Sequence, residues 1–231
     1  MKKKINLKNI RKMKLDNYDM QQAKRCLPMD LIKIMESADW AGKIFVGGGY
    51  LRAIVARESI NDIDVFVSSK TEAELLARKL AGRDDIVTTE NAFTVKRKTP
   101  IQVIHRWVFE KAEDVANSFD FTVCCAVISC KEGAWDSFCD DRFYTDLAAK
   151  RLVYRCPERN EDAGGSMIRV LKYYQKGYRT PLSSLAAVIA RLVRDIDLTK
   201  GPGLKDEQWM AHIIRGLLIE VDPNGVHPDE E

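Results

Sequence analysis

The chain has 231 residues, of which 45% are hydrophobic and 31% charged, and its formal net charge is +3 at pH 7. This size and apolar content allow a substantial core in one large or two small domains. No apolar run approaches the roughly 20 residues that a membrane-spanning helix needs, and no apolar segment follows the basic start, so we expect a soluble cytoplasmic protein without a membrane partner.

The charges are distributed unevenly along the chain. Seven basic residues precede the first acid, Asp16, and the last three residues are acidic. A basic arm over residues 1–17 can contact phosphates, although a solubilising terminus has the same composition. Residues 223–231 are expected to form an acidic tail.

Cysteine and histidine do not indicate a structural metal site. The six cysteines include no CxxC pair, and the three histidines show no ligand spacing. Cys124 and Cys125 are adjacent in an expected strand and would therefore face opposite ways. We predict reduced thiols that serve as small core residues, and no disulfide-linked partner.

Periodicity predicts an α+β domain in the first two thirds of the chain. Helices are expected at 18–26, 29–38, 71–80 and 109–117, and strands at 44–46, 62–67, 86–89, 92–96, 101–104 and 119–129. Thr71 and Glu74 form a possible capping box for the third helix, and Gly82 stands just past its end. This order predicts a mixed sheet covered by helices.

The pattern becomes helical after Pro157. Helices are expected at 165–177, 182–198 and 205–220, separated by segments rich in glycine and proline. We therefore predict a head domain over residues 18–156 and a small helical neck domain over residues 157–222.

The strand at 44–46 runs into three glycines, Gly47 to Gly49, and then into a helical stretch. Glycine lets the backbone approach a ligand closely, and a helix N-terminus carries partial positive charge, so this turn suits a phosphate. Asp62 and Asp64 lie in the next strand and point to one face, because side chains alternate along a strand. Two neighbouring carboxylates are costly to bury unless a cation neutralises them, and such oxygen ligands suit Mg²⁺.

These residues resemble the nucleotidyltransferase superfamily that includes polymerase β, and within it the head domain of tRNA CCA-adding enzymes and bacterial poly(A) polymerases. Gly48-Gly49-Tyr50-Leu51-Arg52 is similar to the GGxVRD turn of that family, and the spacing to Asp62 and Asp64 is the expected one. Residues 120–126 are similar to its RRDFTINALA segment, and residues 146–152 to its DLxxKxLR segment.

The resemblance implies a nucleotidyltransferase head followed by a helical neck. It implies that Asp62 and Asp64 hold Mg²⁺, as two ions, and that the nucleoside triphosphate is bound by Gly48, Gly49, Arg52 and Arg169. A third acid on a neighbouring strand would help to activate the acceptor hydroxyl. The expected position is occupied by Gln102, which cannot take a proton, so Asp120 is the candidate for that catalytic role or for holding the nucleotide.

Other positions depart from the family pattern. Ala53 stands where the turn motif has aspartate, and Ser118 and Phe119 stand where the RRDFT motif has two arginines. In the segment 161–169, only Arg169 can correspond to the arginines of the base-reading EDxxRxxR signature. The preference for particular bases is therefore left open.

The sequence thus predicts a Mg²⁺-dependent, template-independent nucleotidyltransferase that moves a nucleoside monophosphate from a triphosphate such as ATP to an acceptor hydroxyl. The acceptor can be a tRNA or other RNA 3′ end, a protein or a small molecule. The alternative is a catalytically silent protein of the same fold that binds RNA or nucleotide as a regulator, which Gln102 favours and the intact Asp62 and Asp64 disfavour.

Overall fold

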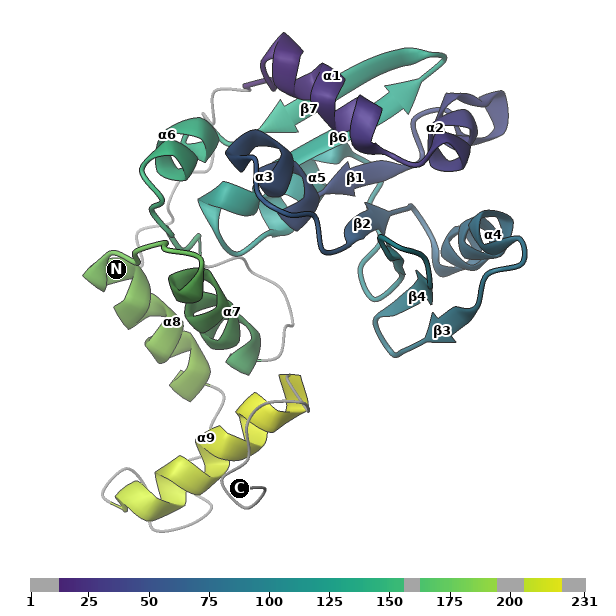
Figure 1. Cartoon of the computed structure of the whole chain (residues 1–231). Coiled ribbons are helices and arrows are strands. Elements are labelled where there is room, and N and C mark those ends of the chain that lie inside the picture. Colours follow the sequence, from purple (N-terminus) through teal and green to yellow (C-terminus); the bar gives the residue numbers. More distant parts are fainter. Residues whose placement is uncertain (1–12, 156–162, 195–205, 222–231) are drawn as a thin grey trace, which may run out of the picture. The chain divides into compact units, whose positions relative to one another are not determined.

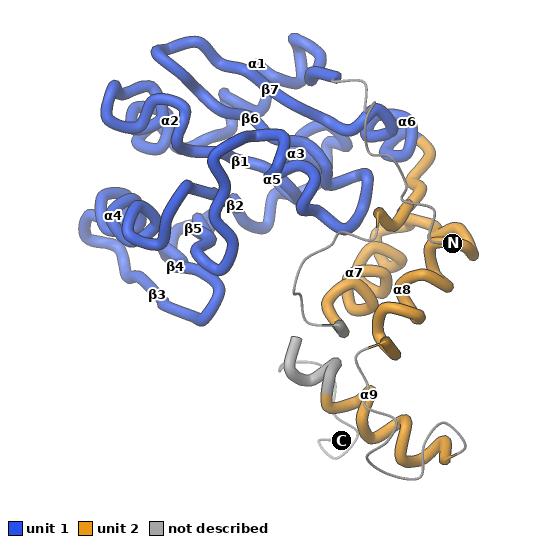
Figure 2. The backbone as a smooth tube through the Cα atoms, turned by 180° about the vertical axis from the view of Figure 1, so that it is seen from behind, with its two compact units in different colours: residues 1–148 blue, residues 149–231 orange. Residues whose placement is uncertain are grey.

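The computed structural model describes residues 13–155, 163–194 and 206–221. The chain divides into two compact units, residues 1–148 and residues 149–231, which Figure 2 shows in separate colours. The described residues do not include positions 1–12 of the expected basic arm (residues 1–17). They also do not include the expected acidic tail (residues 223–231).

A mixed sheet forms the centre of the first unit (Figure 1). Its strand order is β3-β4-β5-β2-β1-β6-β7. The strands are β1 (Phe45–Gly47), β2 (Ile63–Phe66), β3 (Ile86–Thr88), β4 (Ala92–Val95), β5 (Ile101–Ile104), β6 (Ala126–Lys131) and β7 (Ala134–Cys139). Strands β2 and β5 pair in parallel, and the other neighbouring pairs are antiparallel.

The helices follow the predicted pattern in most places. The first unit contains α1 (Asn17–Cys26), α2 (Met29–Glu36), α3 (Gly49–Ala56), α4 (Lys70–Ala81), α5 (Ala112–Ser118) and α6 (Phe143–Ala148), with 3₁₀ turns η1 (Ala38–Trp40) and η2 (Thr122–Cys124). The second unit contains α7 (Ala163–Gln175), α8 (Leu182–Arg194) and α9 (Glu207–Val221). The α+β class is therefore confirmed.

The two faces of the sheet have different coverings. Helices α2, α3 and α4 pack on one face, where alternate strand residues such as Val46, Val65 and Ile128 are fully buried. Helix α5 covers part of the other face and buries a cluster that includes Phe45, Phe66, Val115, Val127 and Phe138. The second face is covered in part by one short helix, and it is the face that carries the alternating polar residues of β2 and β5.

The strand expected over residues 119–129 is wrong in its first half. The N–H groups of Cys124 and Cys125 donate to the carbonyls of Phe121 and Thr122, which closes the turn η2, and β6 begins only at Ala126. The Thr122 hydroxyl donates to Asp146 at 2.8 Å in the protein interior. The apolar run is therefore a buried turn followed by a strand, and Cys124 and Cys125 do not alternate across a sheet.

Two elements and one cap were missed in the sequence. Strand β7 pairs with β6 through a tight turn in which Glu132 and Gly133 have positive φ, and α6 follows it. The predicted capping box at Thr71 and Glu74 is wrong, because the helix begins one residue earlier, at Lys70, and the hydroxyl of the N-cap Ser69 accepts from the N–H of Glu72. Gly82 does end this helix, as expected.

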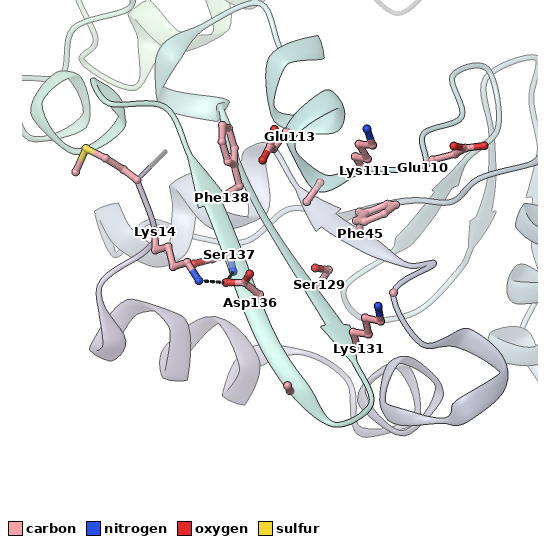
Figure 3. A pocket seen from close by; sticks show the side chains of 14 residues that line it. Lys14, Phe45, Glu110, Lys111, Glu113, Ser129, Lys131, Asp136, Ser137 and Phe138 are labelled. Carbon is pink, nitrogen blue, oxygen red and sulfur yellow. Dashed lines mark hydrogen bonds and ion pairs between the residues drawn. The ribbon is translucent and has the colours of Figure 1, made fainter. Parts of the chain in front are cut away.

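The β6–β7 hairpin and α5 border a cavity of about 630 Å³ on the partly covered face (Figure 3). Its lining includes Phe45, Ser129, Lys131 and Phe138, and at its rim Lys14 forms an ion pair with Asp136 at 2.8 Å. The cavity lies at the start of β1, whereas the glycine turn lies at the end of that strand.

In the second unit, helix α7 is shorter at its C-terminal end than predicted. It ends at Gln175, and Gly177 has φ +85°, so the chain turns before Arg179. Arg179 therefore lies outside the helix, and its backbone pairs with Lys150 and Leu152.

Four of the five described cysteines, Cys124, Cys125, Cys130 and Cys139, are buried, as expected of small core residues. Cys26 is exposed, so the expectation does not hold for it. Among the described residues, none of the helices has the length and apolar content that crossing a bilayer requires.

Arg97 connects three elements of the first unit. Its guanidinium lies 2.7 Å from Asp30 of α2 and 2.9 Å from Asp84, and it also donates to the carbonyl of Leu80 in α4. Burial raises the pKa of Asp30, but the hydrogen bond and charge of Arg97 outweigh burial and hold that pKa below its ordinary value of 3.8.

We predict that Arg97→Gln lowers the free energy of unfolding by about 1 kcal/mol at pH 7, because the paired acids are half-exposed and solvent screens them. A carboxyl whose pKa is lowered by folding stabilises the fold above its unfolded pKa and stops doing so as pH falls through its folded pKa. The difference between wild type and variant should therefore shrink below about pH 4. Urea unfolding at several pH values measures this.

Arg78→Gln is the matched control. Arg78 makes an exposed ion pair with Glu74 within one helix, which is worth at most about 0.5 kcal/mol. A loss for Arg97→Gln no larger than that of the control would contradict the role of Arg97 as a link between elements.

Candidate active site

The glycine turn joins β1 to α3 in a conformation that requires glycine at one position. Gly48 has φ +68° and ψ −134°, a backbone conformation that residues with a side chain rarely adopt. A Cβ atom at Gly48 would lie 2.8 Å from the ring of Phe119, and one at Gly47 would lie 2.9 Å from the carbonyl oxygen of Ala126. The missing side chains therefore let β1 and the start of α3 pack closely against Phe119 and Ala126.

Gly49 is in a different environment. No described atom lies within 4 Å of the position that a Cβ would take there. The helix begins at this residue, and the first N–H groups of a helix have no partner within it. The turn is thus packed on one side and open at Gly49, which is the arrangement that an anion needs.

The orientation of α3 is fixed from its buried side. Tyr50 is 1% exposed, and its hydroxyl donates to the carbonyl of Ala23 in α1 at 2.5 Å. Burial raises the pKa of Tyr50, so the hydroxyl keeps its proton and remains a donor. This contact anchors the first turn of α3 to α1.

Strand pairing brings the carboxylates to the glycine turn. Asp64 lies opposite Gly47 of β1, and its Oδ2 would be 3.5 Å from a Cβ on Gly48. Asp62 directly precedes β2 and is separated from Asp64 by the buried Ile63. Asp62 and Asp64 are both half-buried, on the face of the sheet that α5 covers only in part.

Gln102 lies beside this pair on strand β5. It is directly opposite Asp64 in the parallel β2–β5 pairing, and its side-chain amide donates to Oδ2 of Asp62 at 3.3 Å. The strand predicted over residues 101–104 is thus confirmed, and Gln102 on it lies next to both carboxylates.

Asp120 is not on a strand. It is 3% exposed and lies between the end of α5 and the turn η2. The preceding residue, Phe119, contacts the glycine turn and packs edge-to-face on Phe66 with ring centroids 5.7 Å apart. Asp120 is therefore the chain neighbour of a residue that contacts the glycine turn, although the strand expected at this position is replaced by a bend.

The two arginines of the predicted site have different surroundings. Arg52 is 4% exposed, and its guanidinium lies 3.1 Å from the carboxylate of Glu58, just past the end of α3. Arg169 is half-buried on α7 and belongs to the second compact unit.

The donor set of the first unit fits a hard divalent cation that is shared with a ligand. Among the residues that the structure describes, no group of three or more His, Cys, Asp or Glu side chains is gathered at one point. Two carboxylates and an amide oxygen give only part of a coordination shell. Mg²⁺ is commonly bound by one or two carboxylates together with substrate phosphates, and the adjacent turn suits those phosphates.

Phe119 is the residue of this site whose contact the sequence reasoning missed. The sequence showed only that an expected arginine was absent, whereas the structure shows an aromatic ring against the glycine turn. A sequence signal for the contact was available, because two adjacent glycines in a buried turn leave room that a large neighbouring side chain can fill.

Solved structures of CCA-adding enzymes have the same fold as this chain. The Thermotoga maritima CCA-adding enzyme complexed with tRNA matches with a TM-score of 0.55 at 14% identity, over 90% of this chain and 57% of that one. A complex of CCA-adding enzyme with ATP matches with a TM-score of 0.55 at 15% identity, over 84% of this chain and 49% of that one. At this identity the similarity establishes the nucleotidyltransferase-like fold.

The family model of Gad2, the Gabija anti-defense 2 family, matches residues 20–150, which is more than half of the chain. The chain therefore belongs to this family. The protein "Gabija anti-defense 2" of Bacillus phage SPbetaL7 is 24% identical over 165 residues, which are 70% of this chain and 40% of the relative. This chain thus spans less than half the length of the curated relative that it matches.

We predict that Gly48→Ala lowers the free energy of unfolding by about 1–3 kcal/mol, because alanine is strained in this backbone conformation and its Cβ meets the Phe119 ring. Adding Phe119→Ala should remove the steric part of this loss. In a double-mutant cycle measured by urea unfolding, the double variant should therefore lose at least about 0.5 kcal/mol less than the sum of the two single losses.

Gly49→Ala is the control, because the space around that position is open and alanine favours a helix. It should be neutral or stabilise by about 0.5 kcal/mol. Equal losses at Gly48 and Gly49 would show that the turn is not tightly packed at Gly48.

Proposed function

We propose that this protein is a Mg²⁺-dependent, template-independent nucleotidyltransferase that transfers a nucleoside monophosphate from a nucleoside triphosphate to an acceptor hydroxyl. One observation carries the proposal: Asp64 lies beside the glycine turn at the end of β1, with Oδ2 3.5 Å from the Cβ position of Gly48. A carboxylate that faces an anion-binding turn is unfavourable alone and favourable when a cation bridges it to a phosphate. The nucleotidyltransferase-like fold supports this reading.

In this proposal the chain provides two groups of ligands. The glycine turn binds phosphate oxygens through the backbone N–H groups at the start of α3, beginning with Gly49, while Gly48 supplies the conformation of the turn. Asp62 and Asp64 hold the Mg²⁺ ions, two of them in the complete complex. Bound Mg²⁺ would supply charge neutralisation and a fixed geometry for the phosphates. The open position at Gly49 allows the triphosphate to approach the backbone, and Tyr50 keeps α3 oriented.

The reaction is an in-line substitution at the α-phosphorus. The acceptor oxygen forms a bond to the α-phosphorus while the bond to the bridging oxygen of the β-phosphate breaks, and pyrophosphate leaves. The acceptor hydroxyl loses a proton in this step. We assign Asp120 either that proton or the orientation of the nucleotide, an assignment supported by the contact of its chain neighbour Phe119 with the glycine turn. Arg52 and Arg169 are proposed to help hold the nucleotide.

For the acceptor, we propose an RNA 3′ end. A solved enzyme of the same fold is complexed with tRNA, and seven basic residues precede Asp16 in this chain. In this proposal the head spans residues 18–156, the neck spans residues 157–222, and the basic arm contacts phosphates. The family name indicates the biological setting, in which RNA modification would counteract Gabija defence in a phage-infected cell.

A protein component of the Gabija system is the alternative acceptor, and a protein that binds nucleotide without transferring it is the alternative function. Gln102 favours the silent alternative, because it stands at the position expected for a third acid. The labelling assay described next distinguishes both alternatives from the proposal.

We predict that Asp64→Asn and Asp62→Asn each abolish transfer of label from an α-labelled triphosphate while leaving the fold intact. Removing one of two neighbouring like charges should not lower stability. The measurement is incorporation of label from each of the four triphosphates into cellular RNA or into Gabija proteins, in the presence of Mg²⁺. Circular dichroism and thermal unfolding check the fold.

Asp136→Asn is the matched control, since Asp136 is an exposed carboxylate on the same sheet face and pairs with Lys14. It should transfer label as the wild type does. Full activity in Asp64→Asn would contradict the proposal, and triphosphate binding without any transfer would favour the silent alternative. Incorporation of label into protein alone would show that the acceptor is a protein and not RNA.

For an RNA acceptor, we predict that affinity for tRNA falls steeply with salt and that deleting residues 1–12 makes this dependence shallower. Each phosphate contact that is lost should reduce the log–log slope by roughly 0.7–0.9. The deletion stops at residue 12 because Met13 pairs with Cys139 of β7 and the N–H of Leu15 donates to Ser137.

Fluorescence titrations of labelled tRNA at four salt concentrations measure both slopes, and triphosphate affinity serves as the control that the deletion should leave unchanged. No binding at low salt would exclude tRNA as the acceptor. Equal slopes for the two proteins would exclude the arm as a phosphate contact.

A further inference from the structure

Gln102 is held in a specific place by the pairing of β2 with β5. The parallel register sets Gln102 opposite Asp64, and strand alternation keeps it on the same face as the two carboxylates. Its neighbour on the other side, Thr94 of β4, is also directly opposite it in register. The side chain therefore has defined strands on both sides and points along the face where Asp62 and Asp64 lie.

The amide of Gln102 interacts with one particular oxygen. Its Nε2 donates to Oδ2 of Asp62 at 3.3 Å. A hydrogen bond donated to a carboxylate stabilises its ionised form and fixes its orientation. In this orientation Asp62 lies on the same face of the sheet as Asp64, with which it would hold a cation. Because the amide is neutral, it donates this hydrogen bond without adding a third negative charge.

We propose that Gln102 is the positioning residue of this centre: it orients Asp62 for a divalent cation and limits the negative charge, so that the cation binds tightly only together with a triphosphate. This inference rests on the proposed function and deepens it. A centre with two carboxylates gives a free cation few ligands, whereas phosphate oxygens held at the glycine turn supply the remainder. Nucleotide and cation then bind as one unit.

The test compares two substitutions of similar size, one that removes the hydrogen bond without changing the charge and one that adds a negative charge. Gln102→Leu removes the hydrogen bond and keeps the volume, and Gln102→Glu keeps the shape and adds a carboxylate. The probe is Mn²⁺, whose binding is measured by electron paramagnetic resonance with and without a non-hydrolysable triphosphate between pH 5.5 and 8. This readout does not depend on transfer to any acceptor.

In the wild type, we expect the triphosphate to raise Mn²⁺ affinity at least tenfold. Gln102→Leu should lower the affinity of the nucleotide-bound centre by about tenfold, which is the usual effect of losing a partner that orients a metal ligand. Gln102→Glu should raise the affinity for Mn²⁺ alone by about tenfold at pH 8.

Thr94→Val is the matched control, because it changes a polar side chain on the neighbouring strand in the same register and should leave Mn²⁺ affinity unchanged. Wild-type affinity in Gln102→Leu, or no gain in Gln102→Glu at pH 8, would overturn the inference.

Asp64→Asn separates that failure from a failure of the proposed function. If Asp64→Asn abolishes Mn²⁺ binding while both Gln102 variants behave as the wild type, only the role of Gln102 is wrong. If Asp64→Asn binds Mn²⁺ as the wild type does, the proposed metal site itself is wrong.

Discussion

The close approach of the β1–α3 turn to the start of β6 is the constraint on which the site depends. The N–H of Gly48 donates to the carbonyl of Ala126 at 3.2 Å, and a Cβ at Gly47 would lie 2.9 Å from that same oxygen. This contact ends β1, sets the direction of α3 and brings the ring of Phe119 against the turn. A residue with a side chain at either glycine would separate these segments, and the open position at Gly49 would lose its place beside Asp64.

Strand register converts this local packing into a site. Gly47 of β1 lies opposite Asp64 of β2, and Asp64 lies opposite Gln102 of β5. The start of the glycine turn, a carboxylate and an amide therefore form one row across three neighbouring strands. A slip of β2 by one residue would turn Asp64 into the core and Ile63 or Val65 toward the open face. Ile63 and Val65 are at most 1% exposed, so their burial fixes the register. The core thereby holds in place two carboxylates whose mutual repulsion opposes their proximity.

The sequence predicted those parts of the site that depend on local chemistry. The glycine turn, the alternation of β2 and the position of Gln102 follow from residue type and period, and the structure has all three. Asp120 could not be placed in the same way, because the apolar run 119–129 has the composition of a buried strand and its first half is turned by long-range contacts, including that of Thr122 with Asp146. Strand β7 was missed because its residues alternate only weakly between apolar and polar.

Two departures from the family motif act on the charge of the site in opposite directions. Gln102 stands where the resemblance implies an acid, and Ser118 and Phe119 stand where it implies two arginines, so fixed charges of both signs are missing. Gln102 contacts Asp62, and Phe119 contacts the glycine turn. With fewer fixed ionic groups in the proposed centre, a cation and a triphosphate would find more of their neutralising charge in each other, which is the physical reason to expect that the two bind jointly.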